Sequence, residues 1–271
     1  MVTRSRTTLI VAATALATVA GLLVTEVSAG APDPFVPALS SQLESAPNGE
    51  RARVKAADKT AGKAGRLQPR MKRKFIPFGH KRKMQMARYS DRHYGKRRYR
   101  LRNPRVIVEH YTDGPTMMSA WWTMANNSKN LGEYPGVCTH FIIGKSGRIY
   151  RIVPLQLRCR HTIGLNQTAI GIEHVGTSDR SVMARDAQRK ASYRLTLWLI
   201  AKFDIRVRNV IGHAESLRSP LRHEKYKSWR CNNHTDFSHR TMERYRQVIR
   251  ERAREHNLRT GGKPRWVKSN C

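Results

Sequence analysis

The sequence predicts an α/β domain, because segments with the pattern of strands alternate with segments that have the spacing of helices. Short apolar runs bounded by turn residues occur between positions 106 and 172, and apolar residues recur at helical spacing between 186 and 203. Only 39% of the 271 residues are hydrophobic and the net charge is +33, so the core must be concentrated in one part of the chain.

The strands are expected at 106–108, 141–143, 149–153 and 169–172. A turn from Gly144 to Gly147 separates the second from the third, which predicts a hairpin. Helices are expected at 116–126, 186–203 and 241–256. In the second of these, Leu195, Trp198 and Leu199 have the spacing of one buried face.

Residues 1–29 predict a signal peptide. Arg4 and Arg6 precede an apolar run at 9–24, and small residues at 27–29 offer a cleavage site. A retained membrane anchor is the alternative, since the run approaches the length of a bilayer span. The protein is therefore expected to be secreted, either extracellular or associated with the cell wall.

Residues 30–100 predict a disordered basic linker or pro-segment. The stretch from 51 to 100 has 19 Lys and Arg residues against two acids, and such a segment has too few apolar residues to fold alone. It is either a solvated linker or an electrostatic anchor to anionic cell-wall polymers or a membrane surface. A catalytic domain at 101–257 and a basic tail at 258–271 are expected to follow.

Four cysteines in an exported chain favour disulfide bonds. Three pairings are possible, and we favour Cys138 with Cys159 and Cys231 with Cys271. The absence of any Cys-x-x-Cys pair argues against a four-cysteine zinc site.

Histidines at the ends of strands provide the chemistry. His110 follows the first apolar run, His213 follows the run at 210–212, and Asp236 lies in a later His-Thr-Asp cluster. Two imidazoles and one carboxylate, with one position left open, are a typical catalytic zinc site.

Six motifs in order resemble the type 2 N-acetylmuramoyl-L-alanine amidase family, which shares its fold with animal peptidoglycan recognition proteins. They extend over about 106–245 and comprise Glu109-His110-Tyr111, Thr139-His140-Phe141, His161-Thr162, Ala169-Ile170-Gly171-Ile172-Glu173, Gly212-His213 and His234-Thr235-Asp236.

This resemblance implies one catalytic domain with a central mixed β-sheet flanked by helices. It makes His110, His213 and Asp236 the ligands of Zn²⁺ and Glu173 the catalytic base. The implied reaction is cleavage of the amide bond between N-acetylmuramic acid and L-alanine of peptidoglycan. His234 stands where many relatives have a lysine that stabilises the oxyanion, so the resemblance gives it a catalytic role.

The resemblance also gives expectations for residues outside the zinc-ligand set. His161 and Asn166 lie in a loop that lines the substrate groove in the family, so each is expected to contact substrate. Thr139 stands where some relatives have a tyrosine, and it is too short to replace a phenol. The histidine at 140 is expected to be packed in the core. The histidines at 174, 223 and 239 are expected to lie on the surface or in loops. The glutamate at 215 is expected to be an exposed carboxylate or a partner of the zinc ligand His213.

Two alternatives remain at this stage. The first is a non-catalytic peptidoglycan-recognition module, although such modules usually lack a zinc ligand. The second is a secreted nucleic-acid-binding protein or nuclease, suggested by the positive charge, which attracts any polyanion. We expect peptidoglycan as the partner, no specific nucleic acid, and a monomer.

Overall fold

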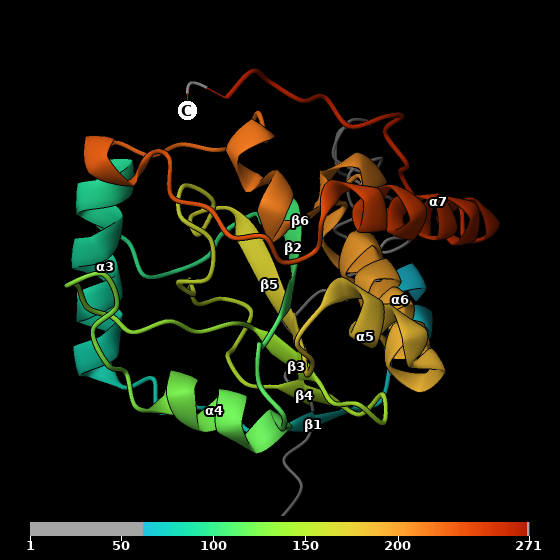
Figure 1. Ribbon diagram of the computed structural model, residues 1–271, viewed down its shortest axis with the longest axis horizontal. Helices are drawn as coiled ribbons and strands as arrows, with labels where there is room; N and C mark the ends of the chain where they lie inside the picture. Colours follow the sequence, from blue (N-terminus) through green and yellow to red (C-terminus); the bar gives the residue numbers. More distant parts are fainter. Residues whose placement is uncertain (1–61, 270) are drawn as a thin grey trace, which may run out of the picture. The chain divides into compact units, whose positions relative to one another are not determined.

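The computed structural model describes residues 62–269 and Cys271, and its centre is a six-stranded mixed sheet (Figure 1). The predicted α/β class is confirmed. The strands are β1 (Met71–Arg73), β2 (Val106–Tyr111), β3 (Phe141–Ile143), β4 (Ile149–Arg151), β5 (Ala169–His174) and β6 (Val210–Gly212). The helices are α3 (His80–Tyr94), α4 (Met117–Ala125), α5 (Asp179–Ala184), α6 (Asp186–Phe203) and α7 (His239–Glu255), with 3-10 turns η1 (Val207–Asn209), η2 (His213–Arg218) and η3 (Lys227–Trp229).

The strand order is β1-β4-β3-β5-β2-β6. Strands β3 and β4 pair antiparallel, which confirms the predicted hairpin, whereas β3, β5, β2 and β6 run parallel to one another. The carboxyl ends of β5, β2 and β6 therefore meet at one edge of the sheet. Ligand sites in parallel sheets form at such an edge.

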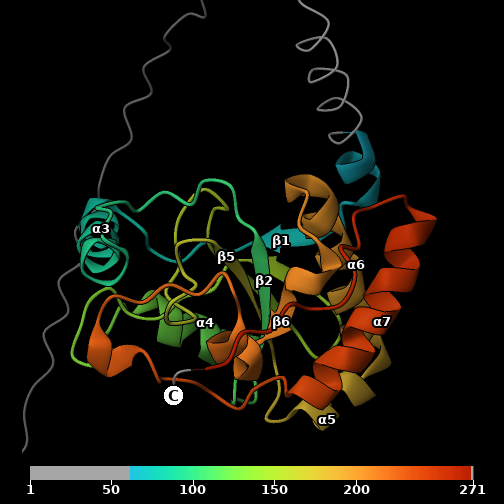
Figure 2. The ribbon, with the colours of Figure 1, turned by 90° about the horizontal axis from the view of Figure 1, so that it is seen from above.

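Helices cover both faces of the sheet. In Figure 1, α5, α6 and α7 lie on one side and α3 and α4 on the other, and Figure 2 shows the same division from above. The main core joins strand residues such as Phe141 and Ile172 to Leu195 and Trp198 of α6 and Tyr245 of α7. A second cluster joins the opposite strand face to α4. Three helices begin with a hydroxyl cap, supplied by Thr116, Ser178 and Ser238.

The prediction that residues 30–100 are disordered is wrong for 62–100. Here β1 joins the sheet edge and α3 packs with a buried face that includes Arg82, Met86, Tyr89 and His93. These residues follow helical spacing, which the high average charge of the segment conceals. The folded domain therefore begins before residue 101.

The predicted basic tail at 258–271 also packs on the domain. The backbone amides of Val207 and Arg208 donate to the carbonyls of Arg259 and Thr260. The disulfides Cys138–Cys159 and Cys231–Cys271 confirm both predicted pairings, and the second fastens the chain end.

The predicted signal peptide and residues 30–61 lie outside the described residues. Within the part that the structure describes, no helix is both long and apolar enough to span a bilayer.

Candidate active site

Strands β2 and β5 place two functional side chains next to each other. In their parallel pairing His110 lies in register with Glu173. The neighbouring Glu109 points the other way, since its carboxylate accepts a hydrogen bond of 2.8 Å from Thr196 of α6. Because side chains alternate along a strand, His110 and Glu173 point to the face away from α6.

His213 reaches the same place from β6. Gly212, the last residue of that strand, pairs with Glu109, so the following residue lies beside His110. The two imidazole rings are 4.6 Å apart between centroids, in an edge-to-face arrangement. This is the strand-end position that the sequence predicts for both histidines.

Asp236 arrives on the loop before α7, and this loop packs directly against β6. The amide of Ala214 donates to the carbonyl of Asp236 at 3.0 Å. A Cβ atom on Gly212 would lie 1.9 Å from the carbonyl oxygen of Phe237, so only glycine permits this approach. The carboxylate of Asp179 accepts from the amides of Phe237 and Ser238, both at 2.8 Å. The sequence gives little signal for Asp179, because an acidic residue directly after a helix cap is a common pattern.

The side chains of His110, His213 and Asp236 form a set of convergent ligand atoms, all within 4.8 Å of one another and all from buried residues. Nδ1 of His110 is 2.9 Å and Nδ1 of His213 is 3.3 Å from the Asp236 carboxylate. Burial lowers the pKa of His110 to about 4, so the ring is neutral, as a metal ligand must be. Although burial alone would raise the pKa of Asp236, hydrogen bonds from both histidines hold it well below its ordinary value. This donor set fits Zn²⁺.

Glu173 lies at the side of this set. Burial, and after it the charge of Asp236, raises the pKa of the Glu173 carboxyl to about 8. Its Oε2 atom has no hydrogen-bond partner among the described residues. A carboxyl group with a pKa near neutrality and a free oxygen is suited to accepting and returning a proton.

Two further histidines line the site. The ring of His234 stacks on that of His213, with centroids 4.6 Å apart and 17° between planes. Nδ1 of His161 lies 3.2 Å from Nε2 of His110 and 2.9 Å from the hydroxyl of Thr162. Both histidines line the same cavity.

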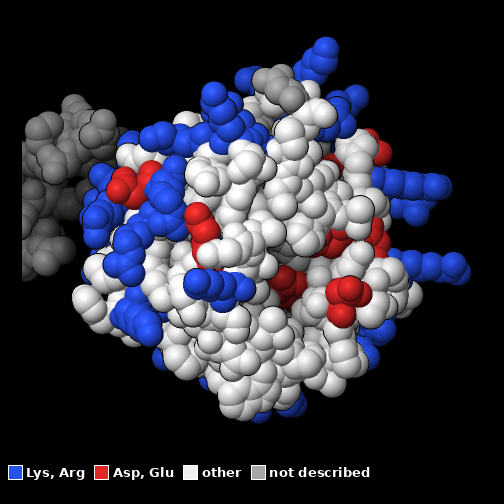
Figure 3. All heavy atoms as spheres, turned by 60° about the vertical axis from the view of Figure 1, so that its left-hand side comes forward, with Lys and Arg blue, Asp and Glu red and all other residues white. Residues whose placement is uncertain are grey.

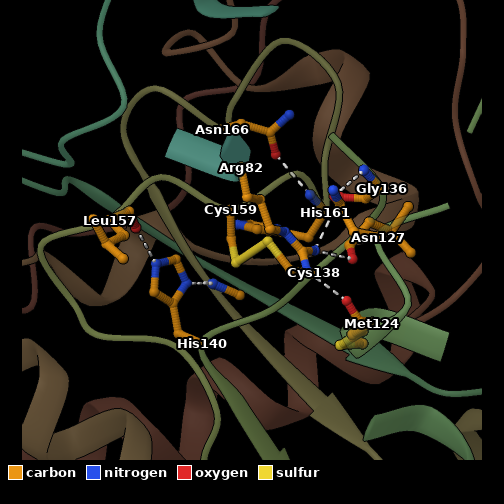
Figure 4. Close-up of a disulfide and its surroundings, with 12 residues drawn as sticks. Arg82, Met124, Asn127, Gly136, Cys138, His140, Leu157, Cys159, His161 and Asn166 are labelled. Carbon is orange, nitrogen blue, oxygen red and sulfur yellow. Dashed lines mark hydrogen bonds between the residues drawn. A yellow bond between two sulfur atoms is a disulfide. The ribbon is translucent and has the colours of Figure 1, made fainter. Parts of the chain in front are cut away.

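Asn166 does not occupy the predicted substrate-contacting position. It is fully buried, and its Oδ1 accepts from the amides of His161 and Thr162, both at 2.8 Å, while its Nδ2 donates to the hydroxyl of Tyr94. Asn166 therefore shapes the loop that presents His161 (Figure 4). A glycine at 171 makes room beneath this loop, because a Cβ atom there would lie 2.8 Å from the His161 ring.

Three other polar residues considered in the sequence are buried in the structure. His140 is a core residue as expected, with Nδ1 accepting from the amide of Gly171 and Nε2 facing the carbonyl of Leu157 (Figure 4). His174, expected near the surface, is fully buried and bonded to Ser192 of α6. The glutamate at 215 is buried too, and it pairs with the arginine at 246 and the histidine at 239 rather than with His213.

The cavity over the site has a volume of about 530 Å³ and is lined by six of the seven predicted site residues, all but Asn166. Figure 3 shows a face of the molecule whose margins carry many Lys and Arg side chains, whereas its middle is mostly uncharged with a few acidic groups.

Helix α3 supports one wall of this cavity. The Arg82 guanidinium donates to the carbonyls of Met124, Gly136 and Val137, and Met124 and Val137 line the cavity. The ring of His93 is fully buried between the carboxylates of Glu224 and Glu133, at 2.9 and 3.1 Å. The supporting roles of Arg82 and His93 were not expected, because the composition of their segment predicts disorder.

Comparison with known proteins covers the segment that holds His110, Glu173 and His213. Residues 100–228 match the family described as N-acetylmuramoyl-L-alanine amidase. The resemblance seen in the sequence is thereby confirmed for this segment. No curated protein matches the chain significantly.

Three solved structures illustrate the similarity. The amidase LysCS, an endolysin from Clostridium intestinale, is 27% identical, with coverage of 41% of this chain and 69% of that one and a TM-score of 0.33. The amidase AmiD from E. coli is 26% identical, with coverage of 42% and 49% and a TM-score of 0.35. Peptidoglycan recognition protein-LE is 16% identical, with coverage of 55% and 82% and a TM-score of 0.41.

Proposed function

We propose, from the membership of residues 100–228 in the N-acetylmuramoyl-L-alanine amidase family, that this protein is a zinc-dependent peptidoglycan hydrolase. The bond cleaved is the amide between N-acetylmuramic acid and the L-alanine of the stem peptide. The observation that carries the proposal is the convergence of His110, His213 and Asp236 beside Glu173 at the floor of one cavity.

Zinc held by these three residues would supply Lewis acidity toward the scissile carbonyl and would make water a better nucleophile near neutral pH. The protein contributes the proton transfers. The carboxylate of Glu173 takes a proton from the attacking water as the water oxygen bonds to the carbonyl carbon. It then delivers the proton to the leaving nitrogen, so the C–N bond breaks and an amino group forms. Its raised pKa and unpartnered Oε2 support this role.

His234 stabilises the developing negative charge on the carbonyl oxygen in our proposal. The stacking of its ring on His213 fixes the plane of the imidazole at the edge of the cavity. A ring N–H can donate a hydrogen bond to an oxyanion, which is the part played by lysine in many relatives. Thr139 is buried and cannot serve as a second donor to substrate.

Peptidoglycan lies outside the cytoplasmic membrane, so the proposed substrate agrees with the export signal expected at residues 1–29. Two disulfides support the same compartment, because they persist in oxidising environments.

Digestion of purified peptidoglycan followed by mass spectrometry tests the proposal. We expect released stem peptides with a free N-terminal L-alanine, formed by the wild-type protein and not by Glu173→Gln. Peptidoglycan that is bound but left intact by wild type saturated with zinc would replace this proposal with a recognition module. Cleavage within the glycan or inside the stem peptide would refute the bond assignment.

A further inference from the structure

A second cavity, of about 460 Å³, lies at the opposite end of the same strands. Arg105 immediately precedes β2, and Arg208 lies in η1 just before β6. His110 and His213 lie at the carboxyl ends of these two strands. The second cavity is therefore formed by the amino ends of the strands whose other ends carry the zinc-ligand set.

Arginines dominate the lining of this cavity. The lining has five arginines, which come from three separate segments of the chain, and one carboxylate. The arginines are Arg105, Arg206, Arg208, Arg259 and Arg265, and the carboxylate is that of Asp204. The Asp204 carboxylate is already paired with Arg259. Four guanidinium groups thus share a small concave surface without a carboxylate partner in the lining.

Hydrogen bonds join two of the segments that carry these arginines. The Arg208 guanidinium donates to the carbonyl of Gly261 at 2.9 Å, and the amides of Val207 and Arg208 donate to the carbonyls of Arg259 and Thr260. Gly261 has a positive φ of 72°, and a Cβ atom there would lie 2.9 Å from Cβ of Arg206. The backbone at 259–261 is consequently fixed against η1, and the Arg208 guanidinium is held in place before any ligand arrives.

The neighbouring guanidinium groups affect the pKa of one of these arginines. Desolvation, and then the charges of Arg265, Arg206 and Arg259, lower the pKa of Arg208. Like charges placed this close repel one another, and an anion in the cavity would relieve that repulsion.

We propose that this arginine cavity binds a phosphodiester group of a polyol phosphate polymer. Guanidinium groups form paired hydrogen bonds with phosphate oxygens, which suits arginine better than lysine for this task. Asn103 and Asn209 in the lining offer polar groups for neighbouring hydroxyls. The chemistry is separate from the proposed amidase reaction and does not depend on it.

The cavity favours this ligand over two other phosphate-bearing classes. Single-stranded nucleic acid is bound with exposed aromatic rings that stack on bases. The one aromatic residue in the lining is the half-buried Phe203, which packs against the core. The lining contains none of the exposed large apolar side chains of the described residues, so the cavity itself lacks groups that would insert into a bilayer.

The distance between the sites predicts how they can cooperate. Strand β2 has six residues, which corresponds to roughly 17–20 Å along the strand. A phosphodiester group held at the arginine cavity therefore leaves the amidase cavity free. Binding there would retain the enzyme near its insoluble substrate without altering turnover of a small one.

Isothermal titration calorimetry with a synthetic glycerol phosphate oligomer tests the site on the full protein. We expect R206Q/R208Q to weaken binding by about 10-fold or more, since charge-assisted hydrogen bonds are lost. The single variant R105Q changes a lining residue from another segment of the chain and should weaken binding as well. The matched control is R240Q/R244Q, which removes two exposed arginines of α7 outside this cavity.

Equal weakening in R206Q/R208Q and R240Q/R244Q would overturn the proposal, because net charge alone would then explain binding. Unfolding midpoints equal to that of wild type show that the variants are folded. Parallel titrations with oligothymidylate and with phosphatidylglycerol vesicles compare the other phosphate sources. Tighter binding of either one, lost in R206Q/R208Q, would overturn the assignment of the ligand to a polyol phosphate.

Discussion

The two ends of β2 and β6 show two different ways of placing charge on the same strands. At the carboxyl ends, His110 and His213 are buried and each faces the carboxylate of Asp236. At the amino ends, Arg105 and Arg208 are not buried and lie among other arginines. A buried ionisable group needs a partner, because an unpaired one loses its hydration, whereas water and an incoming anion can satisfy exposed ones. Substitutions at the carboxyl ends should therefore have the larger consequences.

The largest effect is expected for the proposed zinc ligands. Asp236→Ala or His213→Ala should lose bound zinc and peptidoglycan hydrolysis together, since two ligands cannot replace three. Elemental analysis of the purified protein and release of stem peptides measure the two properties. The control is Asp113→Ala, which removes an exposed carboxylate from the same cavity and should retain zinc. Stoichiometric zinc in Asp236→Ala would disprove the ligand assignment.

Glu173→Gln should retain zinc but lose hydrolysis by about 100-fold or more, the usual contribution of a general base. The amide has almost the same shape as the carboxyl group and cannot relay a proton. Turnover of a soluble muropeptide, measured alongside zinc content, separates this effect from ligand loss. Wild-type turnover in the variant would point to another group, such as His234, as the base.

Arg82→Ala tests how much the buried Arg82 guanidinium and its hydrogen bonds contribute to the free energy of unfolding. The guanidinium is buried, and its loss would leave three carbonyl acceptors without their donor. We expect a loss of about 3 kcal/mol in the free energy of unfolding. Urea denaturation provides the measurement. Arg88→Ala, on the exposed face of α3, is the control and should change stability little. Equal losses in both variants would contradict the supporting role of Arg82.

The strand pattern and the positions of the two histidines could be predicted because they are local features. Apolar runs and a turn between Gly144 and Gly147 predict the hairpin, and a histidine directly after an apolar run predicts its place at a sheet edge. Helix α3 could not be predicted from average composition. Its buried face uses Arg82 and His93, whose burial depends on carbonyls and carboxylates far away in the sequence.

The supporting residues of the site show the same limit. Asp179 is 57 residues before Asp236, and only the folded chain shows that its carboxylate holds the adjoining amides. Asn166 was expected to contact substrate because its loop lines the groove in the resembling family. Its fully bonded amide instead depends on Tyr94 of α3, a helix that the sequence analysis did not predict.

A smaller effect is expected from Glu133, which joins the cavity wall to α3. Although burial alone would raise its pKa, hydrogen bonds from Arg92 and His93 hold the pKa of Glu133 below its ordinary value of 4.5. A carboxyl group whose pKa is lower in the folded state stabilises the protein above that ordinary value, and the stabilisation disappears as pH falls through the folded pKa. Glu133→Gln should therefore have a lower urea midpoint than wild type at pH 7 and a similar one at about pH 2. A difference that persists unchanged in acid would mean that the carboxylate charge is not the cause.

The smallest effect is expected at the amino ends, where R206Q/R208Q should leave the urea midpoint unchanged or slightly raised. The side chains are only partly buried, and removing two positive charges from the arginine cavity relieves repulsion while the backbone bonds to Arg259 and Thr260 remain. The loss of the Arg208 bond to Gly261 works in the opposite direction. Raising the salt concentration separates these contributions, because repulsion between exposed charges is screened within about 3 Å at 1 M ionic strength. Any stability gained by the variant at low salt should therefore vanish at high salt. A large loss of stability at both salt concentrations would show that the arginines hold the tail in place, and the contrast between the two ends of the strands would then fail.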